Sequence, residues 1–251
     1  MRTEYNWLPA HEGATRTGTD QVGVSFSQHR GAVYEVGGRT VEGDIASGSV
    51  FVTGPEPIVW NRIRELTEAL EIYLEPGLLR DAEPVPVTAG RDGTVLGVAS
   101  VLRRAHVAGA VLSDVAASTL AHRLAAHLRR ESPPPGGLAG VAVDRVAEYV
   151  DAHLGDTLTL DALAAVARLS PFHFARAFKA TTGLAPHQFV TARRMDRALR
   201  VLVSTSVSVP DVAHAVGLSN VSHFRRTFTA HLGVRPGEVR KIRPSPRRGG
   251  V

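Results

Sequence analysis

The sequence contains no cysteine among its 251 residues, which excludes disulfides, thiolate catalysis and cysteine-ligated zinc. Lysine is nearly absent too, with only Lys179 and Lys241. No run of 18 apolar residues occurs, and the first thirty residues lack the basic start and apolar stretch of a secretory signal. We therefore expect a cytoplasmic protein without a membrane span or a disulfide framework.

The composition that is present is that of a globular protein, with 43% hydrophobic and 21% charged residues. Its charge is unevenly distributed. Residues 1–139 hold 13 Arg against 16 acidic residues, a net charge of −3, whereas residues 140–251 hold 16 Lys and Arg against 8 acidic residues, a net charge of +8. This asymmetry predicts that the C-terminal part alone binds a polyanion. The preference for Arg over Lys fits phosphate and guanine contacts, or a GC-rich coding background.

The first half of the chain begins with short β-branched or alternating runs separated by glycines. They predict hairpins of a small antiparallel barrel or sandwich. Apolar residues at helical spacing then predict a helix over 62–74, and the acidic, turn-rich residues 81–93 predict a loop. One or two amphipathic helices are expected over 95–130. The strand-like runs are 22–26, 32–36, 39–41 and 49–53.

A proline- and glycine-rich segment over residues 132–139 is the clearest boundary in the sequence. It cannot be helical and predicts a linker. The fold class expected from this organisation is α+β, with β-structure before the linker and helices after it. The predicted parts are a β-domain over 1–80, a helical segment over 81–131, the linker over 132–139, a helical domain over 140–243 and a disordered tail over 244–251.

A motif occurs twice in the last third of the chain. The first copy runs from Leu163 to Pro186 and the second from Val212 to Pro236. Each copy contains a short apolar helix, a Leu-Ser turn, a longer helix with the frame F-x-R-x-F, and then Gly and Pro. This is the layout of a helix-turn-helix DNA reader. Two copies predict that one chain reads two successive turns of a major groove.

Each longer helix carries two phenylalanines four residues apart, which predicts a core-facing stripe. The opposite face is then predicted to enter the DNA groove. Arg225 is the better candidate for a base edge, because arginine can pair with both guanine acceptors. Arg226, which matches Arg176, is expected to bind phosphate or to brace the fold. The groove-facing candidates are Phe172, Ala175, Arg176 and Lys179 in the first copy, and Val221, Ser222, Arg225 and Arg226 in the second.

Residues 186–203 predict a single long helix between the two copies, with an apolar stripe and a basic face. Such a connector would hold the two readers roughly 34 Å apart, one turn of DNA. On the basic face, Arg193 and Arg194 are candidate phosphate contacts. The alternative is that both are simply solvated.

These motifs resemble the C-terminal DNA-binding domain of the AraC/XylS family of bacterial transcription regulators. The resemblance covers about residues 143–243 and includes G-x-x-P after each reading helix, ending at Pro186 and Pro236. It implies an all-α double helix-turn-helix domain that binds double-stranded DNA. We also expect RNA polymerase as a partner, and no cofactor or metal. The base-contacting positions that the resemblance implies are Phe172, Ala175, Arg176, Val221, Ser222, His223 and Arg225.

The N-terminal half is similar, more weakly, to the cupin-like β-barrel or sandwich that serves as the family's sensor domain. In that framework His29, Arg30 and Tyr34 are candidates for lining a pocket for a small-molecule effector, or else surface strand residues. Residues 112–130 are similar to helices that form a dimer interface in relatives, so a homodimer is expected.

Two other classes of function compete with an effector-controlled regulator. A cupin-type metalloenzyme needs a cluster such as His-x-His with a nearby Glu, but His29 stands alone among the strands and His11 lies in a loose terminus. Other catalytic motifs, such as H-E-x-x-H, G-x-S-x-G and a P-loop, are absent from the sequence. The second alternative is a regulator whose first domain only dimerises or docks a protein. We predict a DNA-binding transcription regulator that is not an enzyme.

Overall fold

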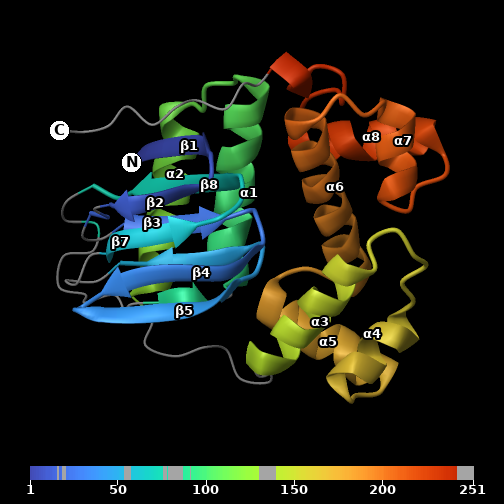
Figure 1. Ribbon diagram of the computed structural model, residues 1–251, viewed down its shortest axis with the longest axis horizontal. Helices are drawn as coiled ribbons and strands as arrows, with labels where there is room; N and C mark the ends of the chain where they lie inside the picture. The colour runs from blue at the N-terminus through green and yellow to red at the C-terminus, as the bar shows by residue number, and fades with distance from the viewer. Residues whose placement is uncertain are drawn as a thin grey trace. The chain divides into compact units, whose positions relative to one another are not determined.

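The structure is a computed structural model of the chain. The described residues form two compact units, and Figure 1 labels the helices and most of the strands. The first unit contains the described residues up to 102 together with 111–129, and the second contains 103–110 together with 140–241. The residues that the structure describes are 1–15, 17–18, 21–53, 58–75, 78, 87–90, 92–129 and 140–241.

The first unit is built on two antiparallel sheets. One has five strands in the order β1 (Arg2–Leu8), β8 (Thr67–Tyr73), β3 (Gln21–Ser25), β6 (Ser49–Val52) and β9 (Val87–Gly90). The other has four, in the order β2 (His11–Ala14), β7 (Ile58–Ile63), β4 (His29–Val36) and β5 (Arg39–Ile45). Among the described residues the sheets share no strand pairing, so this is a sandwich rather than a closed barrel.

Two helices, α1 (Gly93–Ala108) and α2 (Asp114–Leu128), complete this part of the chain. The core forms because alternate residues of the five-stranded sheet are apolar and point to one face. Leu70 and Ile72 of β8 are fully buried there, packed with Val98 and Leu102 of α1 and Leu124 of α2. Burial of each such side chain contributes about 1.5–3 kcal/mol.

The α+β fold class and the strands predicted over 22–53 are confirmed, as are helices within 95–130. The helix predicted over 62–74 is wrong, because these residues belong to β7 and β8. In β8 the buried positions alternate, and the strand pairs with both β1 and β3. Apolar residues three and four apart also fit a helix, and the pairing partners of this strand lie roughly 45 to 70 residues away in the sequence.

Two further expectations in this half need correction. Residues 87–90 of the predicted loop form strand β9, which pairs with β6. His11 does not lie in a loose terminus but begins strand β2, opposite Ile63. The predicted linker over 132–139 and the predicted disordered tail over 244–251 lie outside the described residues.

The second unit is helical. In Figure 1 the long helix α6 runs from the group α3–α5 to the pair α7–α8. The single connector helix predicted over 186–203 is confirmed as α6. The helices are α3 (Gly140–Ala152), α4 (Leu160–Ala167), α5 (Pro171–Thr182), α6 (Pro186–Ser204), α7 (Val209–Ala215) and α8 (Val221–Leu232), followed by the 3₁₀ turn η1 (Val239–Lys241). Within the described residues, no helix is both long and apolar enough to span a membrane.

Candidate nucleic-acid interface

The two copies of the repeated motif fold as two helix-turn-helix units, α4–α5 and α7–α8. Local chemistry sets their ends. The Asn220 side chain accepts a hydrogen bond from the backbone N–H of His223 at 2.9 Å and so caps α8. Pro171 begins α5, where its missing N–H costs no hydrogen bond. Both reading helices end at a glycine with positive φ, Gly183 at 74° and Gly233 at 79°, which a residue with a Cβ adopts only at a cost.

The phenylalanine stripe predicted on each reading helix is confirmed. Phe174, Phe178, Phe224 and Phe228 are all 0% exposed. Their rings pack in pairs, with centroids 5.1 Å apart in α5 and 5.6 Å apart in α8. Phe178 also makes an edge-on contact with Phe189 of α6, at 5.1 Å. Because this stripe faces the core, the opposite face of each reading helix faces solvent.

The candidate base-contacting residues lie on that solvent face. Phe172 is 69% exposed, which is unusual for so large an apolar side chain. The guanidinium of Arg176 lies 5.8 Å from its ring centroid. Lys179 is exposed and Ala175 is half-buried on the same helix. On α8 the exposed candidates are Ser222, His223, Arg225 and Arg226, with Val221 half-buried. Contact of these side chains with DNA stays a prediction.

Arg193 does not fit its predicted role as a phosphate contact, and the structure corrects it. Its side chain is 4% exposed and forms a two-pronged ion pair with Asp151 of α3, whose side chain is 8% exposed. The Arg193 Nε donates to Asp151 Oδ1 at 2.8 Å, and Nη2 donates to Oδ2. A buried guanidinium that donates two hydrogen bonds to one carboxylate is not available to a phosphate. Arg193 instead links α6 to α3.

The Arg194 side chain is also hydrogen-bonded within the protein. It is half-buried, and its Nε and Nη2 donate to the carbonyl oxygens of Leu154 and Asp156 at 3.0 and 2.7 Å. Burial lowers the pKa of this guanidinium from its ordinary value. The turn before α8 packs against this arrangement: a Cβ at Gly217 would lie 2.8 Å from the carbonyl oxygen of Leu154. Arg194 therefore braces the junction between the two helix-turn-helix units.

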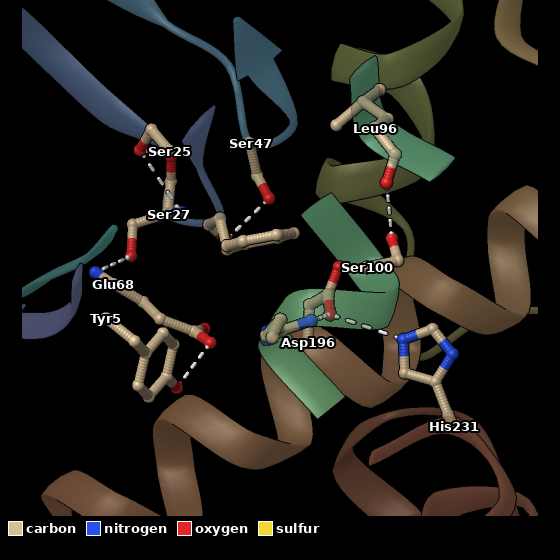
Figure 2. Close-up of polar contacts among 11 residues, drawn as sticks. Tyr5, Ser25, Ser27, Ser47, Glu68, Leu96, Ser100, Asp196 and His231 are labelled. Carbon is tan, nitrogen blue, oxygen red and sulfur yellow. Dashed lines mark hydrogen bonds and ion pairs between the residues drawn. The ribbon is translucent and has the colours of Figure 1, made fainter. Parts of the chain in front are cut away.

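The sequence did not predict a buried charge cluster around Asp196 of α6. Asp196 is 6% exposed and pairs with Nη1 of Arg103, a residue of the second unit, at 2.5 Å. Nε2 of His231 on α8 lies 3.6 Å from the same carboxylate (Figure 2). Burial alone would raise the pKa of Asp196, but the positive charge of Arg103, the hydrogen bond with His231 and the charge of Arg193 outweigh it and hold the pKa below its ordinary value. The only signal in the sequence was a single acidic residue within an otherwise basic helix.

In the first unit one of the three candidate effector-binding residues lies at the surface and two are buried. His29 and Tyr34 are 2% and 8% exposed, whereas Arg30 is exposed. His29 Nε2 lies 3.4 Å from Ser25 Oγ and 3.5 Å from Thr67 Oγ1. Burial raises the pKa of the Tyr34 hydroxyl. Arg30 is therefore not part of any buried site formed by the other two.

Buried polar residues beside His29 were not anticipated either. Ser27 Oγ accepts a hydrogen bond from the backbone N–H of Glu68 at 2.8 Å, and Tyr5 donates its hydroxyl to Glu68 Oε1 at 2.7 Å (Figure 2). Ser47 donates its hydroxyl to the carbonyl oxygen of Phe26 at 2.6 Å. Glu68 is 0% exposed, in a strand that the sequence pattern assigned to a helix. The interior at this end of the sandwich is polar and hydrogen-bonded.

Comparison with known proteins finds a similarity that includes the helix-turn-helix part of the second unit. A family model described as a helix-turn-helix domain matches residues 163–242. The bifunctional transcriptional activator/DNA repair enzyme AdaA of Bacillus subtilis (strain 168) is 31% identical over 100 residues, which cover 40% of this chain and 47% of that protein. A putative AraC-like transcription regulator of Streptomyces antibioticus is 33% identical over 135 residues, covering 52% of this chain and 45% of the relative. The chain thus spans less than half the length of either relative.

Among solved structures, the C-terminal domain of AraT, a response regulator from Geobacillus stearothermophilus, is 27% identical with a TM-score of 0.40, and the match covers 45% of this chain and 93% of that one. The repeated motif, the matched helix-turn-helix model and the AraC-like relative agree with one another. The C-terminal part of this chain is therefore a helix-turn-helix domain of the AraC type.

Proposed function

We propose that this protein is a transcription regulator without enzymatic activity, which binds a bipartite site on double-stranded DNA through α5 and α8. The observation that carries the proposal is the matched pair of reading helices. Each buries its phenylalanines and turns a polar or cationic face to solvent. In such readers, arginine and lysine contacts to phosphates supply affinity, and a few side chains on base edges set the sequence.

The experiment that tests this proposal is a selection of bound duplexes from a random pool with the full chain. The expected result is a motif with two boxes about 10–10.5 base pairs apart, one for each reading helix. A single box would indicate that only one helix reads sequence. Absence of any enriched motif would overturn the proposal of a sequence-specific regulator.

Arg225→Ala tests the assignment of roles within α8. Because arginine can make two hydrogen bonds to guanine, the expected loss is about 1–3 kcal/mol, confined to one base position of the selected site. The matched control is Arg226→Ala, the neighbouring exposed arginine. Affinities for the selected site and its single-base variants give the measurement, and a loss equal across all variants would make Arg225 a phosphate contact instead.

We further propose that the first unit controls the reader in response to a small molecule. Support comes from its sandwich fold, from the buried Tyr34, and from the buried His29 beside the hydroxyls of Ser25 and Thr67. A ligand that binds the folded protein raises its melting temperature, so a thermal-shift screen of small molecules should yield a stabilising compound. Loss of that shift in Tyr34→Phe or His29→Gln would place the compound at these residues.

The alternative role for the first unit is dimerisation or protein docking, including contact with RNA polymerase. Exposed valines favour it: Val111 is 97% exposed and Val115, on α2, is 77% exposed. Under this alternative the protein sediments as a homodimer and Val115→Glu dissociates it. A monomer at micromolar concentration would count against dimerisation.

A further inference from the structure

A groove lies beside the second reading helix. It encloses about 940 Å³ and is lined by α8, by the first residue of α7 and by the residues that follow α8. Three arginines face it, Arg225 and Arg226 from α8 and Arg235 from the following loop, together with Thr229 and Glu238. All three arginines are exposed. The groove therefore presents an open surface with three positive charges and one negative charge.

The negative charge belongs to Glu238, whose carboxylate already accepts a hydrogen bond from a neighbouring residue. Glu238 accepts a hydrogen bond from the backbone N–H of Arg235 at 3.0 Å, which closes the turn after α8. Across the described part of the chain, no carboxylate lies within ion-pair distance of the three guanidinium groups. Arg240 on η1 behaves differently, because its guanidinium donates to the carbonyl oxygens of Ser206 and Val207. Some arginines thus brace the fold, whereas the three groove arginines have no carboxylate partner among the described residues.

The first helix-turn-helix unit lacks two of these three arginines. Counted from the first residue of each reading helix, Arg225 corresponds to Ala175 in α5. Arg235, two residues after Gly233, corresponds to Ala185, two residues after Gly183. Arg226 has an equivalent in Arg176. Arg225 and Arg235 therefore occur only in the second helix-turn-helix unit, so the repeated motif does not itself require them.

From this geometry we infer that the groove binds the sugar-phosphate backbone of double-stranded DNA through Arg226 and Arg235, with Arg235 as a phosphate contact outside the reading helix and Arg225 directed to a base edge. Guanidinium groups suit this role, because their planar donors match phosphate oxygens. The second helix-turn-helix unit then supplies more of the electrostatic affinity than the first, which has Arg176 and Lys179 but carries uncharged Ala175 and Ala185 in place of Arg225 and Arg235. The inference rests on the proposed DNA-binding function, and it adds a residue and an asymmetry that the repeated motif does not contain.

The test is the salt dependence of binding by the full chain to a mixed-sequence duplex of about 40 base pairs, which reports phosphate contacts independently of base readout. Each phosphate contact contributes about 0.9 to the slope of log affinity against log salt concentration. Arg235→Ala is therefore expected to reduce the slope by about 0.9. Relative to the wild type, its affinity loss should be about 3–4-fold greater at 50 mM than at 200 mM salt.

Arg145→Ala is the matched control, because it removes the same charge from an exposed position on α3. Arg235→Lys should keep most of the slope, since lysine also binds phosphate as a point charge. If the wild type binds with a clear salt dependence and Arg235→Ala keeps both its slope and its affinity, as the control does, the inference is wrong. If the wild type binds no duplex at any salt concentration, the proposed function itself fails.

Discussion

Replacing Arg193 by alanine distinguishes a brace of the fold from a contact with DNA. The sequence places this residue on a basic helix face, whereas the structure buries it against Asp151. The guanidinium carbon of Arg193 also lies 6.0 Å from the centroid of the Phe189 ring. The substitution removes both hydrogen bonds to the carboxylate and leaves a buried charge on α3 with its main partner gone.

The size of the effect follows from that burial. Removing one partner of a buried ion pair typically costs about 3–5 kcal/mol, because the remaining charge stays desolvated. A domain of this size unfolds in urea with a slope of about 1–1.5 kcal/mol per molar, so the midpoint should fall by roughly 2–5 M. Replacing both partners by apolar residues, in Arg193→Met with Asp151→Leu, should recover most of the loss, since no unpaired charge remains.

Urea titration followed by far-ultraviolet circular dichroism measures this effect mainly in the helical second unit. Trp7 and Trp60, the two tryptophans of the chain, lie in the first unit, so tryptophan emission provides an internal control that should not change. The salt dependence of binding to mixed-sequence duplex DNA tests the alternative, that Arg193 contacts a phosphate. An unchanged urea midpoint, together with a salt slope reduced by about 0.9, would refute the structural reasoning and restore Arg193 as a phosphate contact.

Two further substitutions test the junctions around α6. Gly217→Ala should destabilise the second unit by about 1–3 kcal/mol, because φ is +75° and the new Cβ would lie 2.8 Å from the carbonyl oxygen of Leu154. Gly237→Ala, with nothing within 4 Å of its Cβ position, should stay within about 0.5 kcal/mol of the wild type, and equal urea midpoints for the two variants would contradict this. The depressed pKa of Asp196 means that its stabilising contribution is fully present above the ordinary carboxyl pKa of about 4 and is lost as pH falls below it. Removing the ion pair in Arg103→Met with Asp196→Leu should therefore flatten the fall of the urea midpoint between about pH 5 and pH 2, and an unchanged acid sensitivity would show that other groups control it.

The helical second half was largely predictable, because its signals are local. Phenylalanines four residues apart identify the buried face of each reading helix, and glycines mark where those helices end. The same local periodicity wrongly predicts a helix at residues 67–73. Leu70 and Ile72 fit a helical stripe, yet they form a central strand whose partners are Arg2–Leu8 and Gln21–Ser25.

The sequence by itself determined the two helix-turn-helix units, the connector helix and the solvent-facing side of each reading helix, because helices are specified by neighbours three and four residues apart. Only the tertiary structure decided which arginines are available to a ligand. Arg193 and Arg194 are held by Asp151 and by loop carbonyls some forty residues earlier in the chain, whereas Arg235 lines the groove beside α8. A charged side chain has the same local signature whether it is solvated or buried in an ion pair, and the difference depends on partners that are brought near only when the chain folds.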